Sequence, residues 1–126
     1  MTLRRWVEAQ AKEIRSRYVK RVPASLEESY SAAFFLAERI HCRVQDVTIM
    51  VGDYSHGMHH WLESKRLGIF IDPAADGDVQ ISELNSTAYK NYSGGQDSLF
   101  RVNVSRDHPR YVYAAATAET PEVPAE

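Results

Sequence analysis

The sequence predicts an α+β domain in which two N-terminal helices pack against a mostly antiparallel sheet. Two amphipathic helical patterns occupy the first 40 residues, and β-branched and aromatic residues then gather in short runs bounded by turn residues. A chain of 126 residues is long enough to bury one core. We therefore expect a single domain over residues 1–115 and a disordered, acidic, proline-containing tail over residues 116–126.

The first helix is predicted over residues 3–20, because this segment contains neither glycine nor proline and places its large apolar side chains near one face. The opposite face carries Arg4, Arg5, Lys12, Arg15 and Arg17, and we interpret it as a solvated surface, with contact to an anion or a peptide as the alternative.

A second helix is predicted over about residues 26–40. Val22 and Pro23 separate it from the first helix, because a proline ring cannot continue a helix interior and restricts the residue before it. Ser25 is the expected N-cap, since Glu28 stands three residues later and completes a Ser-x-x-Glu capping box.

Strands are predicted over residues 43–51, 58–64 and 67–72, where β-branched and aromatic residues are frequent. The last two should form an antiparallel hairpin, because the turn between them is polar.

The register of this hairpin determines which side chains meet. If Ser64–Leu67 form the loop, His59 lies directly opposite Asp72, at a distance where the two side chains can hydrogen-bond. A one-residue slip would bring His60 to the face of Asp72 instead.

The rest of the chain is rich in turn residues. We expect a short strand over residues 79–81, a short helix around 83–89 and a flexible turn over 91–97. Two final strands are expected over 98–104 and 110–116, before the tail.

Composition excludes several classes of partner. The formal net charge is -2, from 15 Lys and Arg against 17 Asp and Glu, so no overall positive field is available for a nucleic-acid backbone. The N-terminus lacks the apolar run of a signal peptide, and no 18-residue apolar stretch occurs. The one cysteine, Cys42, cannot form an internal disulfide. These features predict a cytoplasmic protein without a membrane or nucleic-acid partner.

His59 and Asp72 are the best candidates for a catalytic pair. A carboxylate beside an imidazole fixes its tautomer and favours its protonated form, which gives an oriented general base. The start of a helix stabilises an anion, so position 25 is the favourable place for a nucleophile. A serine hydroxyl does not ionise at neutral pH, so Ser25 would depend on His59 as its base. The backbone N–H of residue 25 would help to bind the oxyanion.

These residues resemble the transglutaminase-like branch of the papain-like cysteine hydrolases. In that family a nucleophilic cysteine opens a helix, often as C-x-x-x-S, and a strand, an H-x-W-x-E motif and a strand ending in D-P follow. The chain has Ser25-Leu-Glu-Glu-Ser29, His59-His60-Trp61-Leu62-Glu63 and Gly68-Ile-Phe-Ile-Asp72-Pro73 in this order. The segment S-L-x-x-S is also similar to the C-L-x-x-S of the leader peptidases of lasso-peptide biosynthesis. The resemblance covers about residues 20–75.

The resemblance implies a papain-like core and a triad at Ser25, His59 and Asp72 that cleaves or transfers at a peptide or isopeptide amide bond. It implies a peptide or protein substrate, no cofactor and no metal, with Trp61 as a wall of the substrate groove.

The serine at position 25 departs from the family, whose nucleophile is cysteine. Three explanations stay open: a natural pseudoenzyme that keeps the groove as a binding module, a cysteine changed to serine to inactivate the protein for crystallisation, and a residue that only caps the helix. Cys42 is interpreted as a structural thiol, because it follows a helix C-terminus, where the dipole disfavours a thiolate.

A metal site is the remaining alternative, with ligands drawn from His56, His59, His60 and either Asp53 or Asp72. It is disfavoured, because His59 and His60 should point to opposite faces of a strand.

Overall fold

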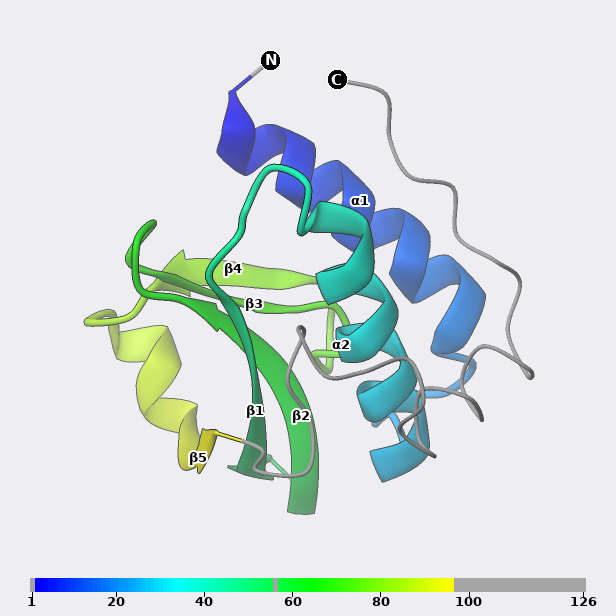
Figure 1. Cartoon of the computed structure of the whole chain (residues 1–126). Coiled ribbons are helices and arrows are strands. Elements are labelled where there is room, and N and C mark those ends of the chain that lie inside the picture. Colours follow the sequence, from blue (N-terminus) through cyan, green and yellow to red (C-terminus); the bar gives the residue numbers. More distant parts are fainter. Residues whose placement is uncertain (1, 56, 97–126) are drawn as a thin grey trace.

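The computed structural model describes residues 2–55 and 57–96, and it confirms the α+β class. Two helices lie on one side of a five-stranded antiparallel sheet, and a short 3-10 helix, η1 (Thr87–Asn91), lies on the other side (Figure 1). No helix within these residues is long and apolar enough to cross a membrane.

Both predicted helices are present and begin at capping side chains. Helix α1 (Leu3–Tyr18) ends two residues before the predicted position, and helix α2 (Leu26–Ile40) has the predicted bounds. Ser25 caps α2 through the complete capping box. Helix α2 packs against both α1 and the strands β1 and β2.

The sheet has the strand order β4-β3-β2-β1-β5. Its strands are β1 (Val47–Tyr54), β2 (Gly57–Ser64), β3 (Ile69–Asp72), β4 (Gln80–Glu83) and β5 (Tyr92–Gln96). The predicted strand at residues 79–81 therefore exists, one residue further along, and the predicted helix around residues 83–89 is η1, which starts later.

Strand β1 starts four residues later than predicted. The chain after α2 first forms a turn, in which the N–H groups of Arg43 and Val44 both donate to the carbonyl of Ile40. This turn satisfies a carbonyl that the helix end would otherwise leave unpaired, and it keeps residues 43–46 out of the sheet.

The prediction of a flexible turn over residues 91–97 is wrong for residues 92–96, which form the edge strand β5. Gly94 lies opposite Gly52 of β1, and a Cβ added to Gly94 would come within 2.2 Å of the Val51 carbonyl oxygen. The glycines therefore permit close approach of two strands rather than a turn. The predicted strands at 98–104 and 110–116 and the tail lie outside the described residues.

The hairpin of β2 and β3 exists, but its register differs from the prediction by two residues. Leu62 pairs with Ile71 and Ser64 with Ile69, so the loop is residues 65–68. Gly68 has φ of 67° and suits this tight loop. A shift by two residues preserves the faces of a strand, so His59 and Asp72 still share one face and are diagonal neighbours.

Two apolar clusters cover the two faces of the sheet. The larger one lies between the sheet and the helices and includes Leu36, Ile49, Leu62 and Ile71. The smaller one lies on the opposite face and is aromatic: its buried members are Met50, Trp61, Phe70 and Tyr92.

Candidate functional site

The neighbouring residues His59 and His60 of β2 point to opposite faces of the sheet. The His60 ring packs edge-on against Tyr30 of α2, at 5.3 Å between ring centroids. The His59 ring lies in the aromatic cluster, 4.7 Å from the ring of Tyr54 and 6.4 Å from that of Tyr92. His56 lies outside the described residues, and in the part of the chain that is described no three His, Cys, Asp or Glu side chains converge as metal ligands would.

His59 and Asp72 form the predicted pair. His59 Nε2 lies 2.8 Å from Asp72 Oδ2, and both side chains are buried, with 5% and 0% of their surface exposed. A hydrogen bond at this distance fixes the imidazole in one orientation. Because Nε2 is occupied, Nδ1 is the ring nitrogen that remains for chemistry, and it has no hydrogen-bond partner among residues 2–55 and 57–96.

Asp72 is held by two further donors. Its Oδ1 accepts a hydrogen bond of 2.9 Å from the N–H of Ala74, two residues later, in a turn that begins where β3 ends. Its Oδ2 also accepts a hydrogen bond of 2.6 Å from the hydroxyl of Tyr92. Burying a carboxylate is unfavourable unless it is well bonded, and these three donors meet that need.

Tyr92 belongs to the candidate site through its bond to Asp72, and the sequence does not indicate it, because the composition of residues 91–97 predicts a turn. It lies on β5, and its ring stacks on that of Tyr54 at 4.3 Å. Burial, followed by the nearby charge of Asp72, raises the pKa of the Tyr92 hydroxyl. The hydroxyl therefore stays protonated and remains a hydrogen-bond donor to Asp72.

Arg15 of α1 holds the segment that follows Asp72. Its guanidinium donates to the carbonyl oxygens of Pro73 and Ala75, at 2.9 and 2.7 Å. The interpretation of Arg15 as part of a solvated face is therefore wrong. Periodicity shows that Arg15 lies off the apolar stripe, but it cannot show that backbone carbonyls lie opposite.

Trp61 supports His59 from within the aromatic cluster. Only 1% of its surface is exposed, and its ring packs against that of Tyr92 at 4.9 Å. Its Nε1 donates to the hydroxyl of Tyr89, which in turn hydrogen-bonds to Glu63. The alternate residues of the H-x-W-x-E motif thus share one face, where His59 bonds to Asp72 and Trp61 is linked to Glu63 through Tyr89. Trp61 is not among the residues that line the pocket at this site.

Ser25 is engaged by the capping box. Its Oγ accepts a hydrogen bond from the N–H of Glu28, and its own N–H donates to Glu28 Oε1. Burial raises the pKa of Glu28, but hydrogen bonds from the N–H groups of Ser25 and Lys20 outweigh this and leave the pKa below its usual value. The backbone N–H that we expected to bind an oxyanion is therefore occupied by Glu28.

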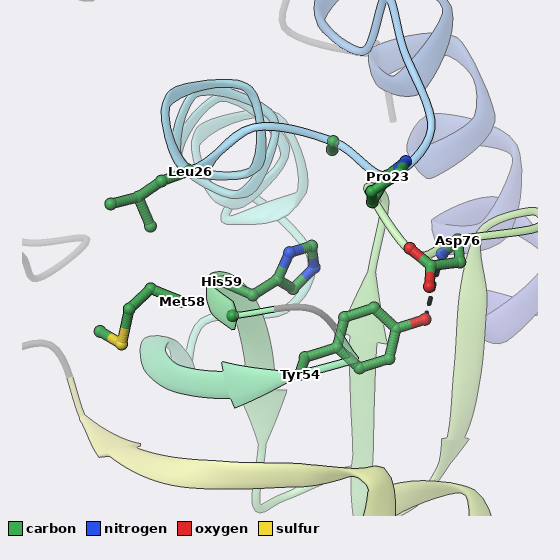
Figure 2. A pocket seen from close by; sticks show the side chains of 8 residues that line it. Pro23, Leu26, Tyr54, Met58, His59 and Asp76 are labelled. Atoms are coloured by element: carbon green, nitrogen blue, oxygen red, sulfur yellow. Dashed lines mark hydrogen bonds between the residues drawn. The ribbon is translucent and has the colours of Figure 1, made fainter.

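A pocket of about 200 Å³ lies between the start of α2 and the start of β2. Its lining residues are Pro23, Ala24, Leu26, Tyr54, Gly57, Met58, His59 and Asp76. Figure 2 shows the His59 ring beneath the chain segment that carries Pro23 and Leu26, the two residues closest to Ser25 that the picture labels. The structure thus brings His59 and the helix start to one site, but no hydrogen bond joins Ser25 to His59 among the described side chains.

Cys42 lies just beyond the C-terminal end of α2, the opposite end from Ser25, and it is exposed. Its Sγ lies 3.6 Å from the carbonyl oxygen of Arg39.

Comparisons with protein-family models, with curated proteins and with solved structures found no match.

Proposed function

We propose that the chain carries a transglutaminase-like, papain-like site that acts on a peptide or isopeptide amide bond. The observation that carries this proposal is the buried hydrogen bond of 2.8 Å between His59 and Asp72. His59 also lines a pocket beside the start of α2. An oriented imidazole beside a helix N-terminus is the arrangement that activates a nucleophile.

The reaction would proceed in two steps. His59 Nδ1 takes the proton of the nucleophile at position 25 as the latter attacks the amide carbonyl, and it then gives the proton to the leaving amine. Water or a second amine resolves the acyl intermediate. Asp72 is the positioning residue, because it holds the imidazole so that Nδ1 faces the pocket.

The helix start must loosen before this chemistry can occur. Ser25 Oγ accepts from Glu28 N–H at 3.1 Å and Ser25 N–H donates to Glu28 at 3.0 Å. A serine here is a weak nucleophile that is already used as a cap, whereas a cysteine would gain from both the dipole and the imidazolium.

Because Ser25 is already bonded to Glu28 as the helix cap, a second function is favoured if serine is the natural residue at position 25. In this alternative the protein is a catalytically inactive pseudoenzyme whose pocket binds a peptide or a partner protein. If the natural gene encodes cysteine at position 25, the hydrolase is favoured. If it encodes serine, the explanation by deliberate inactivation is excluded and the binding module is favoured.

Alkylation of an introduced thiol tests the site. Ser25→Cys is combined with Cys42→Ser, because Cys42 is exposed and would react as well. We expect iodoacetamide to label Cys at position 25 at pH 6 at least about tenfold faster than an ordinary thiol, because His59 favours the thiolate.

Two further variants serve as controls. His59→Ala should abolish the fast reaction, whereas His60→Ala, which removes the neighbouring ring on the other face, should keep it if circular dichroism shows a folded protein. Slow labelling in the parent variant would contradict the hydrolase proposal.

A further inference from the structure

We infer that Tyr92 is a positioning residue for His59: its hydroxyl donates to the same oxygen of Asp72 that binds the imidazole, and it thereby limits how firmly the carboxylate holds a proton on the ring. The inference rests on the proposed function, in which His59 must take up a proton and release it again in each cycle. The shared oxygen, the uncharged donor and the packing of the Tyr92 ring are separate observations that support it.

The two donors meet at one carboxylate oxygen. His59 Nε2 lies 2.8 Å from Asp72 Oδ2, and the Tyr92 hydroxyl lies 2.6 Å from the same atom. The other oxygen, Oδ1, accepts the N–H of Ala74 at 2.9 Å. A carboxylate beside an imidazole stabilises the protonated ring through its negative charge. Because a second donor on the same oxygen is stabilised by that charge as well, less of the charge acts on the ring.

Tyr92 suits this role because its hydroxyl stays uncharged. The residue is buried, and burial, followed by the nearby charge of Asp72, raises the pKa of its hydroxyl. The hydroxyl therefore donates to the carboxylate over the whole pH range in which a histidine titrates, and it adds no charge of its own. A cationic side chain in its place would instead compete with the imidazolium for the charge of Asp72.

The packing of the Tyr92 ring holds its hydroxyl at Asp72 from across the sheet. Asp72 ends β3 and Tyr92 begins β5, and the strands β2 and β1 lie between them. The Tyr92 ring stacks on that of Tyr54 of β1 at 4.3 Å and lies 6.4 Å from the His59 ring. Trp61 packs against it at 4.9 Å. Because these contacts do not involve the hydroxyl, Tyr92→Phe should keep the ring in place and remove only the hydrogen bond.

Several titratable groups surround His59, and one of them bonds directly to its ring. In the described part of the chain they are Asp72 of β3, Tyr54 of β1, Tyr92 of β5 and Asp76, which follows β3 and lines the same pocket. Figure 2 shows Tyr54, whose hydroxyl accepts the N–H of Asp76, beside the His59 ring. The start of α2 faces this pocket with uncharged side chains. A change at the Tyr92 hydroxyl therefore reaches the ring through Asp72, which bonds to both.

The first test follows the protonation of His59 in the full chain with Ser25. Nuclear magnetic resonance of the ring nitrogens is recorded from about pH 4 to 9, and His59 is assigned through its contact with the Tyr54 ring. Tyr92→Phe should move the titration midpoint upward by about one pH unit, or tenfold in proton affinity, because Oδ2 then serves His59 alone. A midpoint that stays in place or moves downward would overturn the inference. So would a wild-type ring that keeps one protonation state throughout.

Two further variants separate this effect from a loss of packing. Tyr89→Phe removes a hydroxyl of the same aromatic cluster that bonds to Trp61 and Glu63, so it should leave the midpoint unchanged. Replacement of Tyr92 by 3-fluorotyrosine keeps the ring and makes the hydroxyl a stronger donor, so the midpoint should fall. Equal shifts in the two phenylalanine variants, or a rise with the fluorinated ring, would contradict the inference. The fluorinated protein decides it if Tyr92→Phe does not fold.

The second test asks whether the shift reaches the reaction. In the variant Ser25→Cys with Cys42→Ser, p-nitrophenyl acetate transfers its acetyl group to the thiol, and water then hydrolyses the thioester. Water gives a proton to neutral His59 Nδ1 as it attacks the carbonyl, and the thiolate leaves, so hydrolysis becomes faster as the ring loses its proton with rising pH. Adding Tyr92→Phe should move this pH profile upward by the shift that the ring titration shows, and adding Tyr89→Phe should not.

The outcomes of the two tests distinguish the inference from the proposed function. A pH profile of hydrolysis that stays in place while the ring titration moves would overturn the role of Tyr92 in the reaction and leave the proposed function intact. A thiol that p-nitrophenyl acetate does not acetylate would contradict the proposed function. The ring titration alone would then decide whether Tyr92 sets the proton affinity of His59.

Discussion

The two faces of the sheet are stabilised by different interactions. The side chains of the neighbouring residues His59 and His60 lie on opposite faces. The face toward α2 is largely apolar, and His60 there lies against Tyr30 while its N–H donates to Ser29. The opposite face is aromatic but contains a fully buried carboxylate, Asp72, which is bonded to His59. The helical face therefore depends on apolar burial, and the opposite face depends also on a complete hydrogen-bond network.

This difference bears on function. A buried carboxylate contributes less to stability than an apolar side chain of the same volume often would, because desolvation offsets its interactions. We therefore interpret Asp72 as part of the proposed site. The pair of Asp72 and His59 lies at the end of the sheet where the pocket opens, whereas His60 lies beneath α2.

The largest effect is expected for Asp72→Ala. This substitution leaves the buried His59 ring, the Tyr92 hydroxyl and the Ala74 N–H without their acceptor, so we expect a loss of about 3–5 kcal/mol in the free energy of unfolding. Urea denaturation measures it. Asp78→Ala removes an exposed carboxylate from the next loop and should change the free energy by less than about 0.5 kcal/mol. Similar costs for both would contradict the network.

Leu62→Ala probes the helical face. Leu62 is fully buried against the helices, and its truncation should cost about 2–5 kcal/mol through lost apolar burial and a residual cavity. In contrast to Asp72→Ala, the variant should keep the fast alkylation at position 25, since it leaves the His59 pair intact. Loss of that reaction in a folded Leu62→Ala protein would show that the two faces are not separable.

Tyr92→Phe removes one donor to Asp72 and keeps the ring. A hydrogen bond to a charged group contributes about 1.5–3 kcal/mol, so we expect a loss within that range. In the double variant with Asp72→Ala the additional cost should be much smaller, because the acceptor is already absent. Strictly additive costs in this double-mutant cycle would mean that the hydroxyl acts through other contacts.

The smallest effect is expected for Glu28→Gln, and it depends on pH. The pKa of Glu28 is lowered in the folded protein, so the ionised carboxylate stabilises the fold above its unfolded pKa of about 4.3. This contribution is lost as the pH falls through the lowered pKa. The stability difference between the wild-type protein and Glu28→Gln should therefore be greatest above about pH 4.3 and vanish in stronger acid. Urea titrations from pH 3 to 7 test this, with the exposed neighbour Glu27→Gln as control. A difference that grows in acid would contradict the sign.

Local patterns in the sequence were enough to predict the two helices, the cap at Ser25 and the hairpin. They also placed His59 and Asp72 on one face, because that face depends only on alternation along each strand. The exact register was missed by two residues, since the loop that contains Gly68 could not be distinguished from one that starts at Ser64.

Long-range contacts account for what sequence reasoning missed. Gly94 and Gly95 are residues typical of a turn. The segment is a strand because it pairs with β1, and this pairing brings Tyr92 to Asp72. The sequence pattern likewise places Arg15 on the helix surface. Only the folded structure shows that its guanidinium donates to the carbonyl of Pro73. Neither contact leaves a periodic signal.

We propose that His59 and the start of α2 form one site. The most direct measurement is the ultraviolet absorbance of the thiolate in the variant Ser25→Cys with Cys42→Ser, titrated from pH 4 to 10. We expect thiolate to be present by about pH 6, and we expect His59→Ala, but not His60→Ala, to shift its appearance to higher pH. A thiolate that appears only near the ordinary thiol pKa of about 8.5, with or without His59, would show that His59 and position 25 do not form one site.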